Sequence, residues 1–234
     1  MKTPVTLLPR STAVFAFGAS LLLASAAQAA DGWVNLFNGK NLDGWEQHSG
    51  KAKYRIEDRA IVGQTVANTG NSFLCTKKTY GDFALELEFK VAKEMNSGIQ
   101  FRSEFYTQDT EKEIKGKKKK FPADRVFGYQ YEIDPSARAF TGGVYDEARR
   151  GWLVELKDNP AAQKAFKQGE WNKVRIECKG DHIQTWINGV KAADFHDDVT
   201  LRGVIALQVH GIGDGTKRKP GEEIRWRNIR LKEL

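Results

Sequence analysis

Two acidic residues, Glu132 and Asp134, lie two positions apart in the stretch Gly128–Asp134, which alternates apolar and polar side chains. Side chains of a β-strand point to opposite faces in turn, so both carboxylates share one face, with Cα atoms roughly 6.5 to 7 Å apart. At that separation one carboxylate can raise the pKa of the other, or both can contact one ligand. The spacing favours acid–base or ligand-binding chemistry over structural ion pairs with Arg102 or Arg125.

Two further segments also alternate polar with apolar side chains. Gln100 and Arg102 are the polar residues of one segment, and Gln208 and His210 are those of the other. A histidine at the end of an apolar strand suits proton transfer near neutral pH, a metal ligand or a hydrogen bond to a sugar hydroxyl, although it can also be a polar residue at a rim. We expect the polar faces of these two segments and of Gly128–Asp134 to line one cleft.

Aromatic side chains could complete a carbohydrate site, because their faces stack on the apolar face of a pyranose ring. The chain has 6 Trp and 6 Tyr, and most tryptophans of a β-sandwich lie in its core. We therefore predict only Tyr145, which follows a pair of glycines, and Trp152 as aromatic contacts of a substrate.

The segments that must position these residues are short and separated by turn residues. Residues 83–91 alternate most regularly between apolar and charged side chains, and Asn188-Gly189 is a strong hairpin turn. Only residues 159–169 have a helical pattern, with Pro160 in the first turn. About a dozen predicted strands without a tandem repeat indicate an all-β fold, an antiparallel two-sheet jelly-roll sandwich of the concanavalin A-like or laminarinase-like type with one short helix.

Residues 1–29 are predicted to be a signal peptide. Lys2 and Arg10 precede an apolar stretch over residues 13–27, and Ala27-Gln-Ala29 fits the small-residue pattern of a cleavage site. The apolar stretch is shorter than the ~20 residues that span a bilayer, so we expect cleavage rather than a membrane anchor. Residues 30–234 would then form a single domain, exported to the periplasm of a Gram-negative-type cell or secreted, without a transmembrane segment.

The formal net charge of +7 is concentrated in one segment. Residues 111–120 contain six lysines and two glutamates, and with Lys2 and Arg10 they account for all but one unit of that charge. A local excess of this kind argues against nucleic-acid binding. A solvated insertion explains it better than attraction to acidic glycans or a membrane surface.

The two cysteines, Cys75 and Cys178, allow two interpretations. In an oxidising compartment they could form a disulfide that closes a loop of about a hundred residues and stabilises the fold by roughly 4 kcal/mol. Cys178 also has the same strand parity as Val174 and Ile176, which is typical of a buried free thiol. The sequence leaves both alternatives open.

Five segments in order resemble the 3-keto-disaccharide hydrolase domain family, long carried as a domain of unknown function. They are Asn35–Trp45, Asn96–Arg102, Gly128–Asp134, Thr141–Tyr145 and Trp186–Gly189. The resemblance covers essentially the whole chain after the predicted signal peptide. It implies a concanavalin-like sandwich, export to the periplasm, and action on glycosides whose C3 hydroxyl has been oxidised to a ketone. The lysine-rich insertion after Phe105 departs from the family pattern and would alter one wall of the cleft and hence the preferred aglycone.

The chemistry that the resemblance implies suits these residues. A C3 ketone acidifies the C2 proton, so a base can remove it, an enolate forms, the C1 substituent leaves by elimination, and water adds back. Strand parity, not the resemblance, assigns the roles: His210 or Glu132 as the base, and Arg102 or a bound divalent cation as the group that stabilises the enolate oxygen. The residues predicted to hold sugar hydroxyls are Gln100, Gln130, Asp134 and Gln208.

Two alternatives remain. The same sandwich serves lectins, so the domain could be a non-catalytic carbohydrate-binding module. It could also be a conventional glycosidase, because jelly-roll enzymes of the laminarinase type carry Glu-x-Asp-x-x-Glu on such a strand. Ala137 occupies the last position of that pattern here, so the two-carboxylate mechanism lacks a member unless another strand supplies it.

Overall fold

The computed structural model describes Met1 and residues 31–93 and 95–234. The predicted signal peptide lies almost entirely outside the described residues, and the prediction stands as an expectation. None of the helices in the described part of the chain is long and apolar enough to cross a membrane.

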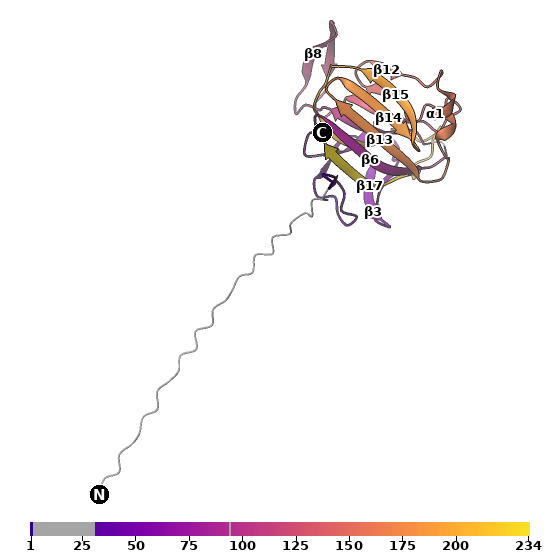
Figure 1. Cartoon of the computed structure of the whole chain (residues 1–234). Helices are drawn as coiled ribbons and strands as arrows, with labels where there is room; N and C mark the ends of the chain where they lie inside the picture. The colour runs from indigo at the N-terminus through magenta and orange to yellow at the C-terminus, as the bar shows by residue number, and fades with distance from the viewer. Residues whose placement is uncertain (2–30, 94) are drawn as a thin grey trace.

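Two antiparallel sheets form the body of the structure (Figure 1). Sheet A has the strand order β15 (Val190–His196), β14 (His182–Ile187), β13 (Asn172–Lys179), β6 (Phe83–Val91), β17 (Glu223–Glu233), β4 (Ala60–Gln64) and β3 (Lys53–Glu57), and β1 (Val34–Asn35) pairs with β17. Sheet B has the order β12 (Gly151–Val154), β11 (Val144–Glu147), β10 (Gly128–Ile133), β7 (Ser97–Ser103), β16 (Val204–Val209), β5 (Ser72–Thr76) and β2 (Trp45–Ser49). The predicted all-β, two-sheet sandwich with one short helix is confirmed.

The core lies between the two sheets and follows from side-chain alternation. In β6 the residues Phe83, Leu85 and Phe89 are fully buried, and in β10 the same is true of Tyr129 and Tyr131. All of them belong to one continuous hydrophobic cluster. Because alternate residues of a strand point to opposite faces, the polar residues of β10 lie on the face of sheet B that is turned away from sheet A.

The three segments with predicted polar faces are neighbours in sheet B. Strand β10 pairs with β7, and β7 pairs with β16, so Gln130 lies opposite Gln100 and Gln208 lies opposite Gly98. The sheet therefore brings together polar residues that are about a hundred positions apart in the chain.

The one helix among the described residues, α1, spans Pro160–Ala165 and is shorter than the predicted 159–169. Asn159 caps it by accepting a hydrogen bond from the backbone N–H of Ala162. The helix ends early because Phe166 adopts an extended conformation and its ring packs parallel to that of Phe89, with centroids 6.1 Å apart.

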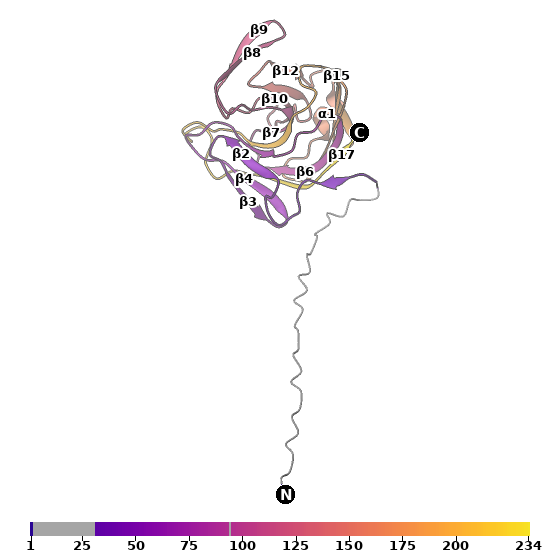
Figure 2. The ribbon, with the colours of Figure 1, turned by 90° about the vertical axis from the view of Figure 1, so that its left-hand side faces the viewer.

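The lysine-rich segment, interpreted above as a solvated insertion, forms a hairpin of β8 (Thr110–Ile114) and β9 (Lys117–Phe121). Lys115 and Gly116 connect the strands with positive φ angles of 47° and 78°, the geometry of a tight hairpin turn. This ribbon stands away from the sandwich in Figure 2. The sequence did not predict these strands, because a run of lysines shows no alternation of apolar and polar side chains.

Cys75 and Cys178 are free and buried. Cys75 lies on β5 in sheet B, whereas Cys178 lies on β13 in sheet A. Burial raises the pKa of the Cys178 thiol to about 12 and that of the Cys75 thiol further. Of the two alternatives, the structure shows buried thiols, which are unreactive at neutral pH.

Candidate active site

A cavity of about 420 Å³ lies over the polar face of sheet B. Strands β10, β11 and β12 supply part of its walls, and residues next to β5, β7 and β16 and in two loops supply the rest. We call it the active-site cavity. The residues that line it are Asn71, Asn96, Gln130, Glu132, Arg138, Tyr145, Glu147, Trp152, His210 and Arg218.

Glu132 is the most deeply placed carboxylate of the active-site cavity, with an exposed fraction of 5%. Asn96 donates a hydrogen bond of 2.6 Å to its Oε1, and Gln130 donates one of 2.7 Å to its Oε2. No lysine, arginine or histidine of the described chain forms an ion pair with it. Burial therefore dominates and raises the pKa of Glu132 to about 7, although the two amide donors lower it. A large fraction of this carboxyl group carries its proton near neutral pH.

Gln100 and Gln208 hold the amide of Gln130 in place. Each donates from its Nε2 to Gln130 Oε1, at 2.6 and 2.8 Å, which leaves Gln130 Nε2 to point at Glu132. Ser103 in turn donates to Gln100 Oε1 at 2.7 Å. Gln100 and Gln208 are fully buried and do not line the active-site cavity, so the expectation that they hold sugar hydroxyls is wrong. They position Gln130, which does line it.

Arg102 does not reach the active-site cavity, contrary to the expectation from strand parity. Its φ angle is +45°, and the β7–β16 register shifts beside it, so the strand alternation breaks at this residue. The guanidinium group is fully buried and donates to the Gly81 carbonyl, the Gly180 carbonyl and the Asp82 carboxylate at 2.7–2.9 Å. Arg102 is an anchor between segments that flank sheet A, not a group for enolate stabilisation.

Asp134 lies just beyond the end of β10 and also stays out of the active-site cavity. Its Oδ2 accepts a hydrogen bond of 3.0 Å from Arg138 Nε, and its Oδ1 accepts one from the Ser136 backbone N–H. The predicted contact of Asp134 with sugar hydroxyls is therefore replaced by an indirect role. Asp134 fixes Arg138, whose guanidinium group does line the cavity.

His210 has a defined tautomer. Its Nδ1 lies 2.7 Å from the carbonyl oxygen of Gly211, which can only accept, so Nδ1 carries the proton and Nε2 of the neutral ring has a free lone pair. Burial lowers the pKa of His210, and the charge of Arg218 adds a smaller lowering that the hydrogen bond to the Gly211 carbonyl opposes. The usual order of the pKa values of a glutamate and a histidine is thus reversed, because Glu132 tends to keep a proton at a pH where His210 has lost one.

Tyr145 and Trp152 form the aromatic wall of the active-site cavity, where the sequence placed them. Their ring centroids are 5.3 Å apart at an interplanar angle of 74°. The guanidinium carbon of Arg138 lies 5.6 Å from the Trp152 ring. An aromatic face beside fixed polar groups is the usual composition of a sugar-binding wall.

The chemistry of the cavity does not suit a divalent cation. Both carboxylate oxygens of Glu132 already accept amide N–H groups, and the arginines Arg138 and Arg218 lie on the same walls. Across residues 31–93 and 95–234 no group of three or more His, Cys, Asp or Glu side chains could hold a metal ion. We therefore assign the positive charge of the site to the arginines.

Residues 32–232 match a family model described as the 3-keto-alpha-glucoside-1,2-lyase-like domain. The chain belongs to this family. The predicted resemblance is thereby confirmed, and the match covers nearly all of the described residues. A curated relative, the 3-keto-disaccharide hydrolase of Bacteroides thetaiotaomicron, is 28% identical to this chain. The alignment covers 88% of this chain and 79% of the relative. Family and relative indicate a carbohydrate-active domain related to hydrolases.

Several solved structures share the fold of this chain. A protein of unknown function with a galectin-like fold, from Bacillus subtilis, matches with a TM-score of 0.57 and 11% sequence identity. The match covers 82% of this chain and 90% of that protein. A predicted glycosyl hydrolase from Parabacteroides distasonis matches with a TM-score of 0.55 and 20% sequence identity. This match covers 88% of this chain and 96% of the hydrolase. The carbohydrate-binding module CBM66 from Bacillus subtilis matches with a TM-score of 0.54 and 16% sequence identity. This match covers 81% of this chain and 96% of the module. At these identities the likeness shows the sandwich fold alone.

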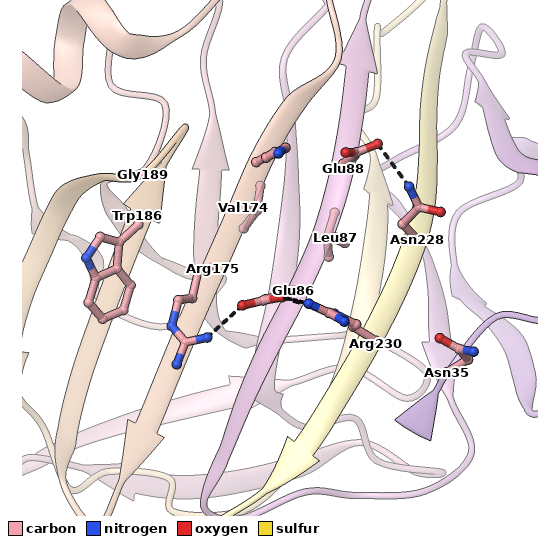
Figure 3. A pocket seen from close by; sticks show the side chains of 11 residues that line it. Asn35, Glu86, Leu87, Glu88, Val174, Arg175, Trp186, Gly189, Asn228 and Arg230 are labelled. Carbon is pink, nitrogen blue, oxygen red and sulfur yellow. Dashed lines mark hydrogen bonds and ion pairs between the residues drawn. The ribbon is translucent and has the colours of Figure 1, made fainter. Parts of the chain in front are cut away.

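A larger groove of about 580 Å³ lies on the outer face of sheet A (Figure 3). Its central carboxylate, Glu86, accepts hydrogen bonds from Arg175 at 2.7 Å and from Arg230 at 2.6 Å. Burial would raise the pKa of Glu86, but the two guanidinium groups outweigh it and lower the pKa. The central carboxylate of this groove is therefore held in its ionised form, so the active-site cavity is the better candidate for acid–base chemistry.

Sequence reasoning missed five residues of the active-site cavity. Glu147 lies two positions after Tyr145 and shares its face, so the parity rule could have found it. It accepts hydrogen bonds from Arg125 at 2.9 Å and from Asn71 at 3.2 Å, and burial raises its pKa. The others come from loops, where parity gives no signal, or from the residue just before β7. They are Asn71, Asn96, Arg138 and Arg218.

Proposed function

We propose that this domain cleaves the glycosidic bond of 3-keto-glucosides by removing the C2 proton, eliminating the C1 substituent and adding water. The observation that carries the proposal is one cavity with a neutral imidazole, His210, and a carboxyl group that keeps its proton, Glu132. Two titratable groups whose pKa values are shifted in opposite directions suit an acid and a base. The family description, a 1,2-lyase, and the name of the relative, a hydrolase, support the two halves of the reaction.

In the first step His210 Nε2 takes the proton from C2, and the electron pair of the C–H bond moves to form the enolate with its charge on the C3 oxygen. Arg138 supplies the positive charge for that oxygen, because Asp134 holds its guanidinium group on the cavity wall. A cation that an ion pair holds in place beside the reacting oxygen stabilises the negative charge that develops there.

In the second step the enolate expels the C1 substituent. Glu132 gives its proton to the glycosidic oxygen as the C1–O bond breaks, a C1–C2 double bond forms, and the C3 ketone returns. Water then adds to C1 of the unsaturated ketone, and a proton returns to C2. The net reaction is hydrolysis, and the leaving group departs as a neutral alcohol.

The two rival functions fit the cavity less well. A carbohydrate-binding module has no need of a buried carboxyl group without a cationic partner, which costs folding stability. A conventional glycosidase would use Glu147, the carboxylate that the neighbouring strand β11 supplies. Arg125 and Asn71 already hold that carboxylate on one side of the cavity.

Incubating a 3-keto-glucoside with the protein in D₂O tests the proposed function. We expect release of the aglycone and a 3-keto sugar with deuterium at C2, or accumulation of the unsaturated 3-ketone, as seen by NMR. A chelator is expected to leave the rate unchanged, and an unoxidised aryl glucoside is expected to stay intact. Hydrolysis without deuterium at C2 above a no-enzyme control would contradict elimination. Binding of unoxidised sugars without turnover of keto-sugars would favour the carbohydrate-binding module.

We also propose that the domain is exported, on the basis of the charged, apolar and small-residue pattern of residues 1–29. Expression in a Gram-negative host should yield a periplasmic protein whose N-terminal sequence begins at Ala30 or Asp31. A chain that retains Met1 and stays with the cytoplasmic fraction would contradict export.

A further inference from the structure

A second cavity of about 700 Å³ adjoins the active-site cavity. We call it the adjoining cavity. Asn96, Arg138 and Arg218 line both, so the two hollows meet at these three residues. Asn96 also donates its hydrogen bond to Glu132. The proposed proton donor of the glycosidic oxygen therefore lies close to the boundary between the cavities.

This arrangement divides a substrate into two parts. The sugar that reacts must lie against His210 and the aromatic wall of Tyr145 and Trp152, all within the active-site cavity. A group attached to its C1 oxygen has to pass Glu132. The adjoining cavity is the space on the other side of the shared residues, so it is the place for the leaving group.

The adjoining cavity has an excess of positive charge. Four of its described lining residues are cationic, Lys93, Arg138, Lys217 and Arg218, and one is acidic, Asp134. The carboxylate of Asp134 is already bound to Arg138 Nε at 3.0 Å. No ion pair or side-chain hydrogen bond of Lys217 or Arg218 exists within the described residues. By contrast, the arginines on the outer face of sheet A, such as Arg175 and Arg230, are paired with glutamates.

Uncompensated cations on the wall of a hollow attract an anionic ligand, and arginine suits a carboxylate because its planar fork can donate two parallel hydrogen bonds. Phe166 adds an aromatic side chain to the same cavity, which a ring-shaped leaving group can contact.

We propose that the adjoining cavity binds the leaving group of the substrate and selects one that carries a carboxylate, with Lys217 and Arg218 as the recognising cations. This inference rests on the proposed function, because it assigns a leaving group to a reaction that the active-site cavity performs. It adds a specificity that neither the family description nor the name of the relative contains.

The test compares two substrates that differ in charge and hardly in shape, the 3-keto-glucosides of 4-hydroxybenzoate and of 4-hydroxybenzamide. At low ionic strength we expect kcat/KM for the carboxylate substrate to exceed that for the amide by about tenfold, the size of one charge-assisted hydrogen bond. The preference should shrink as salt is added, because exposed charges are screened. The double variant Lys217→Gln/Arg218→Gln should bring the ratio close to one.

Lys118→Gln provides the matched control, because it removes a lysine of the β8–β9 hairpin whose side chain is 80% exposed. It should leave the ratio at its wild-type value. Equal kcat/KM for the two substrates in the wild type, or a ratio that survives the double variant, overturns the inference while the turnover itself upholds the proposed function. If neither substrate is turned over, the proposed function is wrong. The affinities of the two unoxidised glucosides then decide the inference, and equal affinities overturn it.

Discussion

Replacing His210 with glutamine is expected to lower kcat/KM by about 10²–10⁴-fold on every 3-keto-glucoside, whatever its leaving group, the usual contribution of a positioned general base. The bond from Nδ1 to the Gly211 carbonyl leaves Nε2 as the only basic nitrogen of the ring. Glutamine can fill the space but cannot accept a proton from carbon. Because removal of the C2 proton precedes the departure of the C1 substituent, a better leaving group cannot rescue the variant.

A 3-keto sugar without a leaving group separates this step from the rest of the reaction. The wild type should exchange its C2 hydrogen for deuterium, and His210→Gln should lose that exchange by the same factor. His182→Gln is the matched control, because His182 lies on β14 in sheet A, stacked on His196 and outside the active-site cavity. Wild-type exchange in His210→Gln would move the base to another residue.

Strand alternation made most of the fold predictable. Residues 83–91 became β6, with Phe83, Leu85 and Phe89 fully buried, because a period of two is an intrinsic property of an extended backbone. The same rule failed where a strand lacks an apolar face. The lysine hairpin β8–β9 has none, and its strands are set by the turn at Lys115 and Gly116.

For the candidate site, the sequence predicted which face of the sheet a side chain lies on but not how deeply that side chain is buried. Parity placed Gln130, Glu132 and His210 at one cavity, because each lies on or beside a strand of sheet B. Gln100 and Gln208 lie on strands of sheet B as predicted, yet both are fully buried and hydrogen-bonded to Gln130. Burial of this kind depends on the packing of neighbouring strands. Arg102 and the residues from loops escaped the rule altogether. A bulge redirects Arg102, and Arg138 and Arg218 reach the cavity through turns whose paths no local pattern specifies.

Replacing Glu132 with glutamine is expected to have an effect that depends on the leaving group. For an alkyl leaving group, such as a second sugar, kcat/KM should fall by about 10²–10⁴-fold, because the departing oxygen needs a proton. For a nitrophenyl leaving group, which departs as a stable anion, the loss should stay within about tenfold. An equal loss on both classes of substrate would contradict the role of proton donor and indicate that Glu132 is the base.

The pH dependence of the wild type and of Glu132→Gln gives the same argument an independent check. The reaction needs a protonated Glu132, with a pKa of about 7, and a neutral His210. The wild-type rate should therefore fall above about pH 7, where Glu132 loses its proton, and also at acidic pH, where His210 gains one. With nitrophenyl substrates the variant should lose the fall at alkaline pH.

Stability shows whether the Glu132→Gln variant is folded. The folded state holds the proton of Glu132 up to about pH 7, whereas the unfolded chain releases it near the ordinary pKa of 4.5, so the wild type loses stability as the pH rises through that window. Glutamine does not ionise. The variant should therefore gain unfolding free energy relative to the wild type by up to about 3 kcal/mol across the same window, measured by urea denaturation. A difference that does not change with pH would mean that Glu132 has an ordinary pKa and cannot hold the proton that the leaving group requires.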